Sequence, residues 1–383
     1  MRTRLASSSF TLTRLTLTDF RNYAALRLDP GPLLVVLTGP NGAGKTNLIE
    51  AISLLGAGRG LRGALFEDLA RLGGNRGWAI AAHVSSPDGE TRLGTQWMPG
   101  GDGANQTRQV VIDGIPQKSP GVLAHHMRVI WLTPAMDRLF AGPASDRRRF
   151  LDRLVTANDP EHASRVLVFE KLMRERNLLL EETRPDGLWL SGLEAQMAEA
   201  AAAIAAARLH AVAALQNHIK FLLKGSAFPA STLGLQGDLE DRLKTMPAVQ
   251  AEDGYRRLLL ESRANDKGAG RTLSGPHRSD LLVSHSSKSM AAALCSTGEQ
   301  KALLIGLILA QAASVKEESG GAPVLLLDEV AAHLDAKRRS GLFETLEGLG
   351  AQSFMTGTDE ALFNGLGKTA DFLHVEGGVV TRR

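Results

Sequence analysis

The sequence contains very little cysteine, no long apolar run and no marked surplus of charge of one sign. Cys295 is the single cysteine, so an intrachain disulfide is excluded and a reducing, cytoplasmic location is expected. No uninterrupted apolar run approaches the roughly 20 residues that a membrane-spanning helix needs, so no membrane partner is expected. Lys and Arg number 44 against 41 for Asp and Glu, and this small excess permits nucleic-acid binding without indicating it.

The opening stretch, MRTRLASSSFTLTRL, is rich in Arg, Ser and Thr and contains no acid. Such a composition could imitate an organelle transit peptide. However, Phe10, Leu12, Leu15 and Leu17 fall near a period of two with one phase slip, and the pattern continues into the segments that follow. This alternation favours a β-strand.

The chain of 383 residues is too long for one ordinary domain, and its patterns change twice. Short apolar or alternating segments before residue 145 predict strands, with a β-meander at 78–114 and a further strand at 129–132. The pattern is then helical, including one helix of more than thirty residues within 190–225. From 270 strands return. The sequence predicts an α/β body from 1–145 and 270–383, split by a helical insertion at 146–269.

The strongest motif is GPNGAGKT at 39–46, which follows an apolar strand and precedes the helical NLIEAISLL. It matches the P-loop pattern, whose glycines let backbone N–H groups surround a phosphate. Lys45 is expected to reach the β- and γ-phosphates and Thr46 to bind Mg²⁺ through its hydroxyl. A glycine-rich turn that only caps the helix is the alternative. The residues expected to bind ATP are Gly39, Pro40, Asn41, Gly42, Ala43, Gly44, Lys45, Thr46 and Asn47.

A second acidic motif, VLLLDE, ends an apolar strand at Asp328 and Glu329. Asp328 is the candidate Mg²⁺ partner, through water, and Glu329 is the candidate catalytic residue that orients the attacking water. Paired acids at a strand end are otherwise often just surface residues. Together with the P-loop, they predict a site for ATP and Mg²⁺.

The segment CSTGEQK at 295–301 precedes an apolar helix, where free backbone N–H groups favour an anion. It resembles the signature of ABC-type ATPases, which implies a contact in trans with the γ-phosphate of ATP held by a second copy, and hence an ATP-dependent homodimer. Alternatively, Ser296 or Thr297 caps the helix and an acid or amide completes a capping box, and both can hold at once. The residues concerned are Ser296, Thr297, Gly298, Glu299 and Gln300.

A set of segments, in this order along the chain, resembles the RecF family of bacterial DNA repair proteins and covers nearly the whole sequence. The segments are LTLTDFRNY (15–23), the P-loop with NLIEAI, WLTP…GPASDRRRFLD (131–152), ERNLLL (175–180), GPHRSDL (275–281), STGEQKALLIGLILAQ (296–311) and LLLDEVAAHLD (325–335). The resemblance implies an ABC-type ATPase head with a short helical arm, since the insertion lacks the long heptad runs of a coiled coil.

The same resemblance implies an ATP-dependent DNA-binding protein that acts on single-strand gaps and loads recombinase with RecO- and RecR-like partners. It implies binding to duplex DNA and to junctions of single and double strands. Asp335 matches the loop that crosses the dimer interface in this class. The alternative function is an ABC-type module coupled to a non-DNA partner such as a transporter.

The motifs assign no role to two groups of basic residues. Arg147, Arg148 and Arg149 form the densest basic cluster and are weak candidates for DNA contact, although a helix start that packs on Asp146 and Asp152 is the simpler interpretation. The sequence gives no physical account of His277 and Arg278.

The segment TGTD at 356–359 stands where many ABC-type ATPases carry a histidine, and no glutamine before the insertion is identified as a partner of Mg²⁺ and water. We therefore hypothesise weak, slow hydrolysis that suits a timed clamp.

Overall fold

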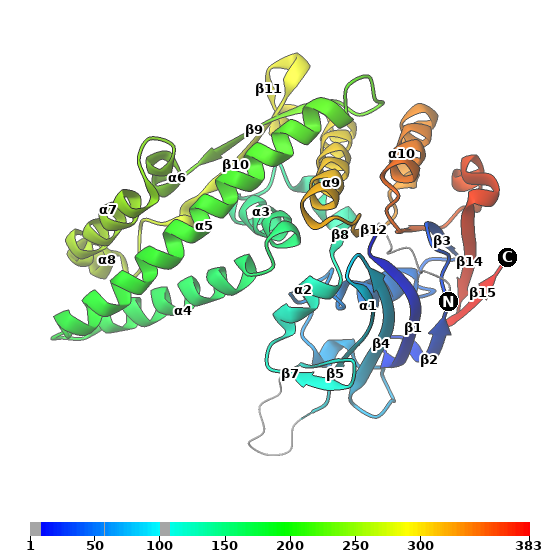
Figure 1. Ribbon diagram of the computed structural model, residues 1–383, viewed down its shortest axis with the longest axis horizontal. Helices are drawn as coiled ribbons and strands as arrows, with labels where there is room; N and C mark the ends of the chain where they lie inside the picture. Colours follow the sequence, from blue (N-terminus) through cyan, green and yellow to red (C-terminus); the bar gives the residue numbers. More distant parts are fainter. Residues whose placement is uncertain (1–8, 57, 100–107) are drawn as a thin grey trace. The chain divides into compact units, whose positions relative to one another are not determined.

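The structure, a computed structural model, describes residues 9–56, 58–99 and 108–383 (Figure 1). The transit-peptide alternative falls largely on residues 1–8, which lie outside the described residues. The chain divides into two compact units. The head unit comprises Met1–Asp137, His218–Ala230 and Ser296–Arg383, and the helical unit comprises Arg138–Asn217 and Ser231–Cys295.

A six-stranded sheet carries the carboxyl ends from which the candidate site is built. Its order is β15-β14-β3-β13-β12-β8, with parallel pairing from β14 to β8 and an antiparallel edge strand β15. Its central strands are continuous apolar runs because both faces are covered. The strands are β3 (Leu34–Thr38), β8 (Val129–Leu132), β12 (Val324–Leu327), β13 (Ser353–Gly357), β14 (Ala370–Glu376) and β15 (Val379–Arg382).

A second six-stranded sheet of the head unit is antiparallel, in the order β2-β1-β4-β5-β6-β7. Its strands alternate buried and exposed residues, and the predicted meander is confirmed as β4, β5 and β6. The strands are β1 (Thr11–Phe20), β2 (Tyr23–Leu28), β4 (Trp78–Ser86), β5 (Gly89–Trp97), β6 (Gln109–Ile112) and β7 (Ile115–Gln117).

One hydrophobic core joins the two sheets of the head unit. It contains Leu15 and Ile80 from the antiparallel sheet, Val35 and Leu326 from the parallel sheet, and Leu48 from α1. Helix α1 is therefore held at the end of β3 by packing on both sheets. The helices of the head unit are α1 (Lys45–Ser53), α2 (Leu123–His126), α9 (Thr297–Ser319) and α10 (Ala336–Leu349).

The helical unit is not purely helical, which differs from the expectation for 146–269. Strand β9 lies within that range and pairs with β10, the segment SDLLVSH that the sequence pattern places in the head. Residues 270–295 and 138–145 therefore group with the helical unit, while 218–230 group with the head. Its elements are α3 (Ala144–Asn158), α4 (His162–Glu181), α6 (Asp238–Leu243), α7 (Ala248–Glu261), α8 (Arg263–Ala269), β9 (Ser231–Gln236), β10 (Asp280–His285) and β11 (Met290–Ala291).

The long helix is confirmed as α5 (Gly187–Leu222), which has 36 residues. By length and composition alone α5 could cross a membrane, although the sequence patterns do not suggest it. Half of its most apolar window is buried inside the structure. Met197, Ala201 and Ile204 of α5 pack with Phe169 of α4 and Tyr255 of α7 in the core of the helical unit. A core helix of a soluble protein meets the same length criterion.

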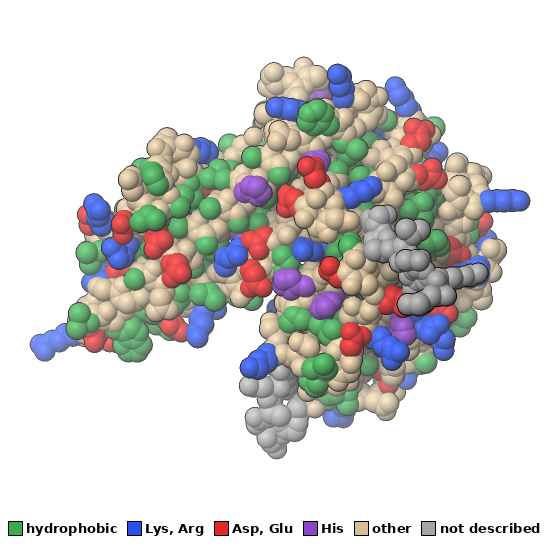
Figure 2. All heavy atoms as spheres, viewed as in Figure 1, with side chains coloured by type: hydrophobic (Ala, Val, Ile, Leu, Met, Phe, Trp, Pro, Cys, Tyr) green, Lys and Arg blue, Asp and Glu red, His purple; other side chains and the backbone are tan. Residues whose placement is uncertain are grey.

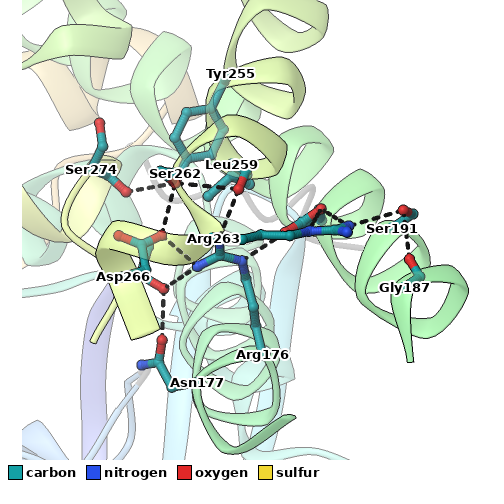
Figure 3. A network of polar contacts seen from close by, with 12 residues as sticks. Arg176, Asn177, Gly187, Ser191, Tyr255, Leu259, Ser262, Arg263, Asp266 and Ser274 are labelled. Atoms are coloured by element: carbon teal, nitrogen blue, oxygen red, sulfur yellow. Dashed lines mark hydrogen bonds and ion pairs between the residues drawn. The ribbon is translucent and has the colours of Figure 1, made fainter. Parts of the chain in front are cut away.

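A buried ionic network, drawn in Figure 3, connects four helices and the segment after α8 in the helical unit. Arg176 of α4 is fully buried and donates to Glu194 of α5 and to Asp266 of α8, at 3.0 and 2.8 Å. Further bonds from Arg176 reach Thr272 Oγ1 and the carbonyl of Leu259. The network fixes the helices that surround it.

Candidate nucleotide site

The P-loop leaves β3 at Thr38 and reaches α1 at Lys45, as the motif predicts. Gly39 and Gly44 have φ values of 144° and 114°, which L side chains rarely adopt. A Cβ atom on Gly39 would lie 2.1 Å from the carbonyl oxygen of Val375, and one on Gly44 would lie 2.4 Å from Asn22 Nδ2. Only glycine fits at these two positions of the loop.

Lys45 spans the loop from the first turn of α1. Its Nζ donates to the carbonyl oxygens of Gly39 and Pro40 at 2.7 and 2.8 Å, and the residue is 5% exposed. Burial lowers the pKa of Lys45, against the opposing effect of Glu329 and Asp328. Among the described residues it forms no ion pair, so this buried cation is bonded only to neutral groups and can accept an anion.

Asp328 directly follows β12 and faces the P-loop. The hydroxyl of Thr46 donates to Asp328 Oδ1 at 3.0 Å, which joins two residues 282 positions apart. Mg²⁺ prefers oxygen ligands at about 2.0–2.1 Å in octahedral geometry, and neighbouring ligands then lie about 3 Å apart. The hydroxyl oxygen of Thr46 can offer a lone pair to such a cation while its O–H still donates to Asp328. These residues therefore fit Mg²⁺.

The protein supplies few ligands of its own to this cation. Among the residues that the structure describes, no group of three or more His, Cys, Asp or Glu side chains could hold a metal. Mg²⁺ commonly keeps several waters and takes phosphate oxygens from its substrate. The expected site therefore depends on a bound nucleotide.

Glu329, the candidate catalytic residue, is partly exposed and has the left-handed φ of 49°. Its backbone N–H donates to Thr356 Oγ1 at 2.9 Å, and Thr356 donates to Asp328 Oδ1 at 2.7 Å. Sequence analysis missed Thr356 and saw in its segment only the absence of a histidine. Its place at the end of a buried strand beside VLLLDE was the available signal.

The DFRNY segment supports the P-loop, a role that the sequence did not reveal. Asn22 Nδ2 donates to the carbonyl of Ala43 at 3.0 Å, and Asn47 donates to Asn22 Oδ1 at 2.9 Å. Tyr23 is buried, and its hydroxyl donates to the carbonyl of Gly44 at 3.0 Å. These bonds hold the backbone of the loop from the turn between β1 and β2 and from the first residue of β2.

The signature segment begins α9 with a capping box, so that interpretation is confirmed. Ser296 Oγ accepts from the N–H of Glu299, and the Glu299 carboxylate accepts from the N–H of Ser296. Ser296, Thr297 and Gly298 are exposed, Glu299 is half-buried, and a Cβ atom on Gly298 would meet nothing within 4 Å. An open helix start remains for the predicted contact in trans.

Asp335 occupies an equivalent position at α10. Its carboxylate accepts from the N–H of Arg338 at 2.8 Å, which caps the helix, and the residue is exposed. The predicted role across a dimer interface stays a prediction.

The three candidate DNA-binding arginines have different surroundings. Arg147 forms a bidentate ion pair with Asp280, and Arg148 donates to the carbonyl of Ser279 at 2.7 Å. Arg149 is largely exposed and pairs with Asp146. Arg147 and Arg148 thus hold α3 to the GPHRSDL segment, and a DNA contact by any of the three stays a prediction.

Asp152, expected beside these arginines, instead bonds to His162 and Arg208. Burial would raise the pKa of Asp152, but the hydrogen bond from His162 and the charge of Arg208 lower it below its usual range. Of the two acids expected at this helix start, Asp146 pairs with Arg149, whereas Asp280 takes the place expected for Asp152.

The GPHRSDL segment has a structural account in the helical unit. His277 Nε2 bonds to the carbonyl of Thr272 at 3.0 Å, and its ring stacks on Phe169. Burial lowers the pKa of His277. Arg208 donates to the carbonyl of Pro276, while Arg278 is exposed. The two motifs DRRRFLD and GPHRSDL therefore meet each other.

On the face shown in Figure 2, basic and acidic side chains are interspersed with hydrophobic ones, and no broad basic patch covers the atoms drawn in colour. This distribution agrees with the nearly balanced charge of the sequence. No DNA surface is assigned from it.

Comparisons with known proteins agree over the whole chain. Residues 11–381 match the family model described as the RecF/RecN/SMC N terminal domain. The DNA replication and repair protein RecF of Mesorhizobium japonicum is 54% identical over 370 residues, which cover 96% of this chain and 97% of that protein. The protein of the same name from Agrobacterium fabrum is 52% identical over 378 residues, covering 98% and 100%.

Solved structures show the same fold. The structure described as the recombination mediator protein RecF-ATPrS in the RecFOR pathway has a TM-score of 0.86 at 25% identity, covering 98% of this chain and 99% of that chain. The Smc head domain from Pyrococcus furiosus has a TM-score of 0.52 at 14% identity, covering 98% and 96%, and supports the fold alone.

Proposed function

Since this chain belongs to the RecF family of DNA replication and repair proteins, we propose that it is an ATP-dependent DNA-binding protein of recombinational repair. It binds ATP, closes as a homodimer on DNA at gaps and helps to load recombinase. Its partners are RecO- and RecR-like proteins, which agrees with a structural relative described within the RecFOR pathway. The transporter-type alternative is not favoured, because the similar proteins carry repair names over their full length.

One observation carries the proposal: the 3.0 Å bond between Thr46 Oγ1 and Asp328 Oδ1. Folding brings the P-loop and the acidic strand end together from opposite ends of the chain. Lys45, a buried cation that bonds to two carbonyl oxygens, lies in the same loop. Thr46 would hold Mg²⁺ through its hydroxyl and Asp328 would hold it through water, and the residues from Gly39 to Asn47 would hold the phosphates.

The chemistry is hydrolysis of ATP to ADP and phosphate. Mg²⁺, when bound, supplies positive charge beside the β- and γ-phosphates. Glu329 orients the attacking water and accepts its proton. Hydrolysis is slow, because no histidine stands in the TGTD segment to contact the γ-phosphate. We expect DNA to stimulate it. Steady-state turnover well above a few per second would contradict this, since typical enzymes lie near 10 s⁻¹.

ATP acts as a removable link between two copies. The exposed start of α9, with Ser296 and Gly298, receives the γ-phosphate of ATP held by the partner, and Asp335 contacts the same interface. ATP shifts the equilibrium because it binds the dimer better than the monomer. Hydrolysis removes the link and releases DNA.

Sedimentation velocity with and without ATP tests the dimer. We expect ATP to convert monomer to dimer. Glu329→Gln should remain dimeric longer, because the carboxamide keeps the shape of the site but slows hydrolysis. Ser296→Arg should abolish the dimer and keep ATP binding. Gln96→Arg, which adds the same charge on an exposed position of β5, is the matched control and should dimerise normally.

Two outcomes would contradict the proposal. Monomers of the wild type at high concentration with ATP bound would leave the capping box as the whole role of Ser296. A dimer that forms with ATP but binds no duplex or gapped DNA in a fluorescence anisotropy titration would favour the non-DNA alternative.

A further inference from the structure

The hydroxyl of Thr356 lies between the two acids of the nucleotide site. Strand β13 lies between β3 and β12, and Met355 pairs with Leu327 in the parallel register. The residues that follow this pair, Asp328 and Thr356, therefore lie side by side. The Oγ1 atom of Thr356 lies 2.7 Å from Asp328 Oδ1, and Thr356 is 1% exposed.

The same hydroxyl also holds the backbone of Glu329. The Glu329 N–H donates to Thr356 Oγ1 at 2.9 Å, and Glu329 has a φ of 49°. A left-handed conformation is unfavourable for a residue with a side chain and persists only where the surroundings impose it. The bond from Thr356 is one such restraint.

The count of protons fixes the direction of both bonds. The hydroxyl has one proton, and a backbone N–H cannot accept it, so the proton goes to Asp328. Oδ1 of Asp328 therefore accepts hydrogen bonds from the hydroxyls of both Thr46 and Thr356. One side chain thus sets the orientation of the metal-binding acid and of the backbone that carries the catalytic acid.

We propose that Thr356 is a positioning residue that holds Asp328 and Glu329 in the arrangement needed for Mg²⁺ binding and water activation. The inference rests on the proposed ATPase function and deepens it. Thr356 does not touch the reacting atoms. Residues of this outer kind typically contribute about 10- to 100-fold to metal affinity or activity.

The test compares Thr356→Val, which keeps the shape and removes the hydroxyl, with Thr356→Ser, which keeps the hydroxyl. Thr95→Val is the matched control, because Thr95 is also buried in the head unit and its hydroxyl also donates one bond and accepts one. Each protein is measured for steady-state ATP turnover, for affinity of a fluorescent ATP analogue with Mg²⁺ or with EDTA, and for thermal unfolding.

We expect Thr356→Val to lower kcat about 10- to 100-fold. It should also lose most of the gain in nucleotide affinity that Mg²⁺ gives, and keep its affinity in EDTA within about twofold, since the P-loop itself is unchanged. Thr356→Ser should restore kcat and the Mg²⁺ effect to within about threefold of the wild type. Thr95→Val should unfold at a lower temperature and retain both.

Two results would overturn the inference. If Thr356→Val matches Thr95→Val in kcat and in the Mg²⁺ effect, the hydroxyl has no positioning role. If Thr356→Ser is as impaired as Thr356→Val, packing of the methyl group is responsible instead. A wild type that neither binds nor hydrolyses ATP would refute the proposed function itself. Because this result comes from the wild type alone, it is distinguishable from the two variant results that would refute the role of Thr356.

Discussion

The head unit and the helical unit each bury a basic side chain, but they treat its charge differently. In the helical unit, Arg176 is fully buried and bonds to the carboxylates of Glu194 and Asp266. In the head unit, Lys45 is almost as buried, yet among the described residues its ammonium group bonds only to two carbonyl oxygens of the P-loop, and Glu329 and Asp328 act on it without forming an ion pair. Figure 3 shows the dashed contacts that join Arg176 to the residues around it.

This difference distinguishes a structural charge from one kept for a ligand. A buried charge is tolerated when it is paired and all its hydrogen bonds are made, and such a cluster then fixes the elements around it. A buried cation without an acidic partner is costly unless an anion binds it. The comparison therefore supports Lys45, rather than Arg176, as the residue that meets a phosphate.

The strongest test of the comparison is to remove Arg176. Arg176→Met leaves Glu194 and Asp266 buried without their common partner, and breaking such a pair typically costs about 3–5 kcal/mol. We expect hydrogen exchange in peptides from α4 and α5 to accelerate strongly. ATP affinity should not change, because the P-loop belongs to the head unit.

The matched control is Arg256→Met, because Arg256 is 57% exposed and pairs with Asp253. An exposed pair typically contributes less than about 1 kcal/mol, so exchange in α4 and α5 should stay near the wild-type rate. Equal effects of the two variants would contradict the structural role of the Arg176 network.

Much of the head unit could be predicted from the sequence because its signals are local. The family and the fold class are confirmed. The glycine pattern of the P-loop and the apolar strand before Asp328 each follow from a short segment whose spacing has one physical purpose. The residue roles assigned to these motifs stay predictions.

The second test removes Lys45 from the head unit. Lys45→Met should weaken ATP binding about a hundredfold or more, since each bond to a charged group contributes about 1.5–3 kcal/mol and 1.4 kcal/mol is a factor of ten. The unfolding temperature should be unchanged or higher, because the variant removes a desolvated charge. Nucleotide titration and thermal unfolding measure the two effects.

Lys301→Met provides the opposite case within the head unit. Lys301 is also buried but has an acidic partner, Asp137, at 3.4 Å. We expect the variant to unfold at a lower temperature while ATP affinity at monomeric concentrations is retained. A large loss of stability in Lys45→Met would show that Lys45 is structural too.

The helical unit was harder to predict because its decisive contacts join distant segments. Nothing local marks Arg176 as buried, and its acidic partners lie 18 and 90 positions away. Strand β9 was missed because its pattern, STLGLQ, contains a glycine and gains its stability from pairing with β10. The same pairing moved the boundary expected at 270.

The third test concerns the anion that the head unit is proposed to receive from a second copy. Gly298→Ala adds a methyl group where nothing lies within 4 Å, and alanine favours a helix over glycine. The monomer should therefore fold at least as well as the wild type. ATP-induced dimerisation should weaken about tenfold by sedimentation velocity, because the methyl group occupies the place proposed for the partner's phosphate. Unchanged dimerisation would remove this segment from the interface.

The smallest expected effect is a pH dependence confined to the helical unit. The pKa of Asp152 is lowered from its ordinary value of 3.8, because bonds from His162 and Arg208 outweigh the effect of burial. A group whose pKa is lowered by folding stabilises the folded state above its unfolded pKa, and that contribution is lost as pH falls through the folded value. The contribution of Asp152 is therefore complete above about pH 5, begins to fall near pH 4, and is lost as the pH drops through the lowered folded pKa.

Hydrogen exchange of α3 and α5 between pH 3 and 6, corrected for the intrinsic rate, measures this contribution against Asp152→Asn. The wild type should lose additional protection below about pH 4, whereas the variant, already weaker at pH 6, should show a flatter profile. Peptides from α1 should give the same profile in both proteins, since Asp152 belongs to the helical unit. Parallel profiles in α3 and α5 would mean that Asp152 is not stabilised by its partners, and the helical unit would then hold a charge no better compensated than that of Lys45.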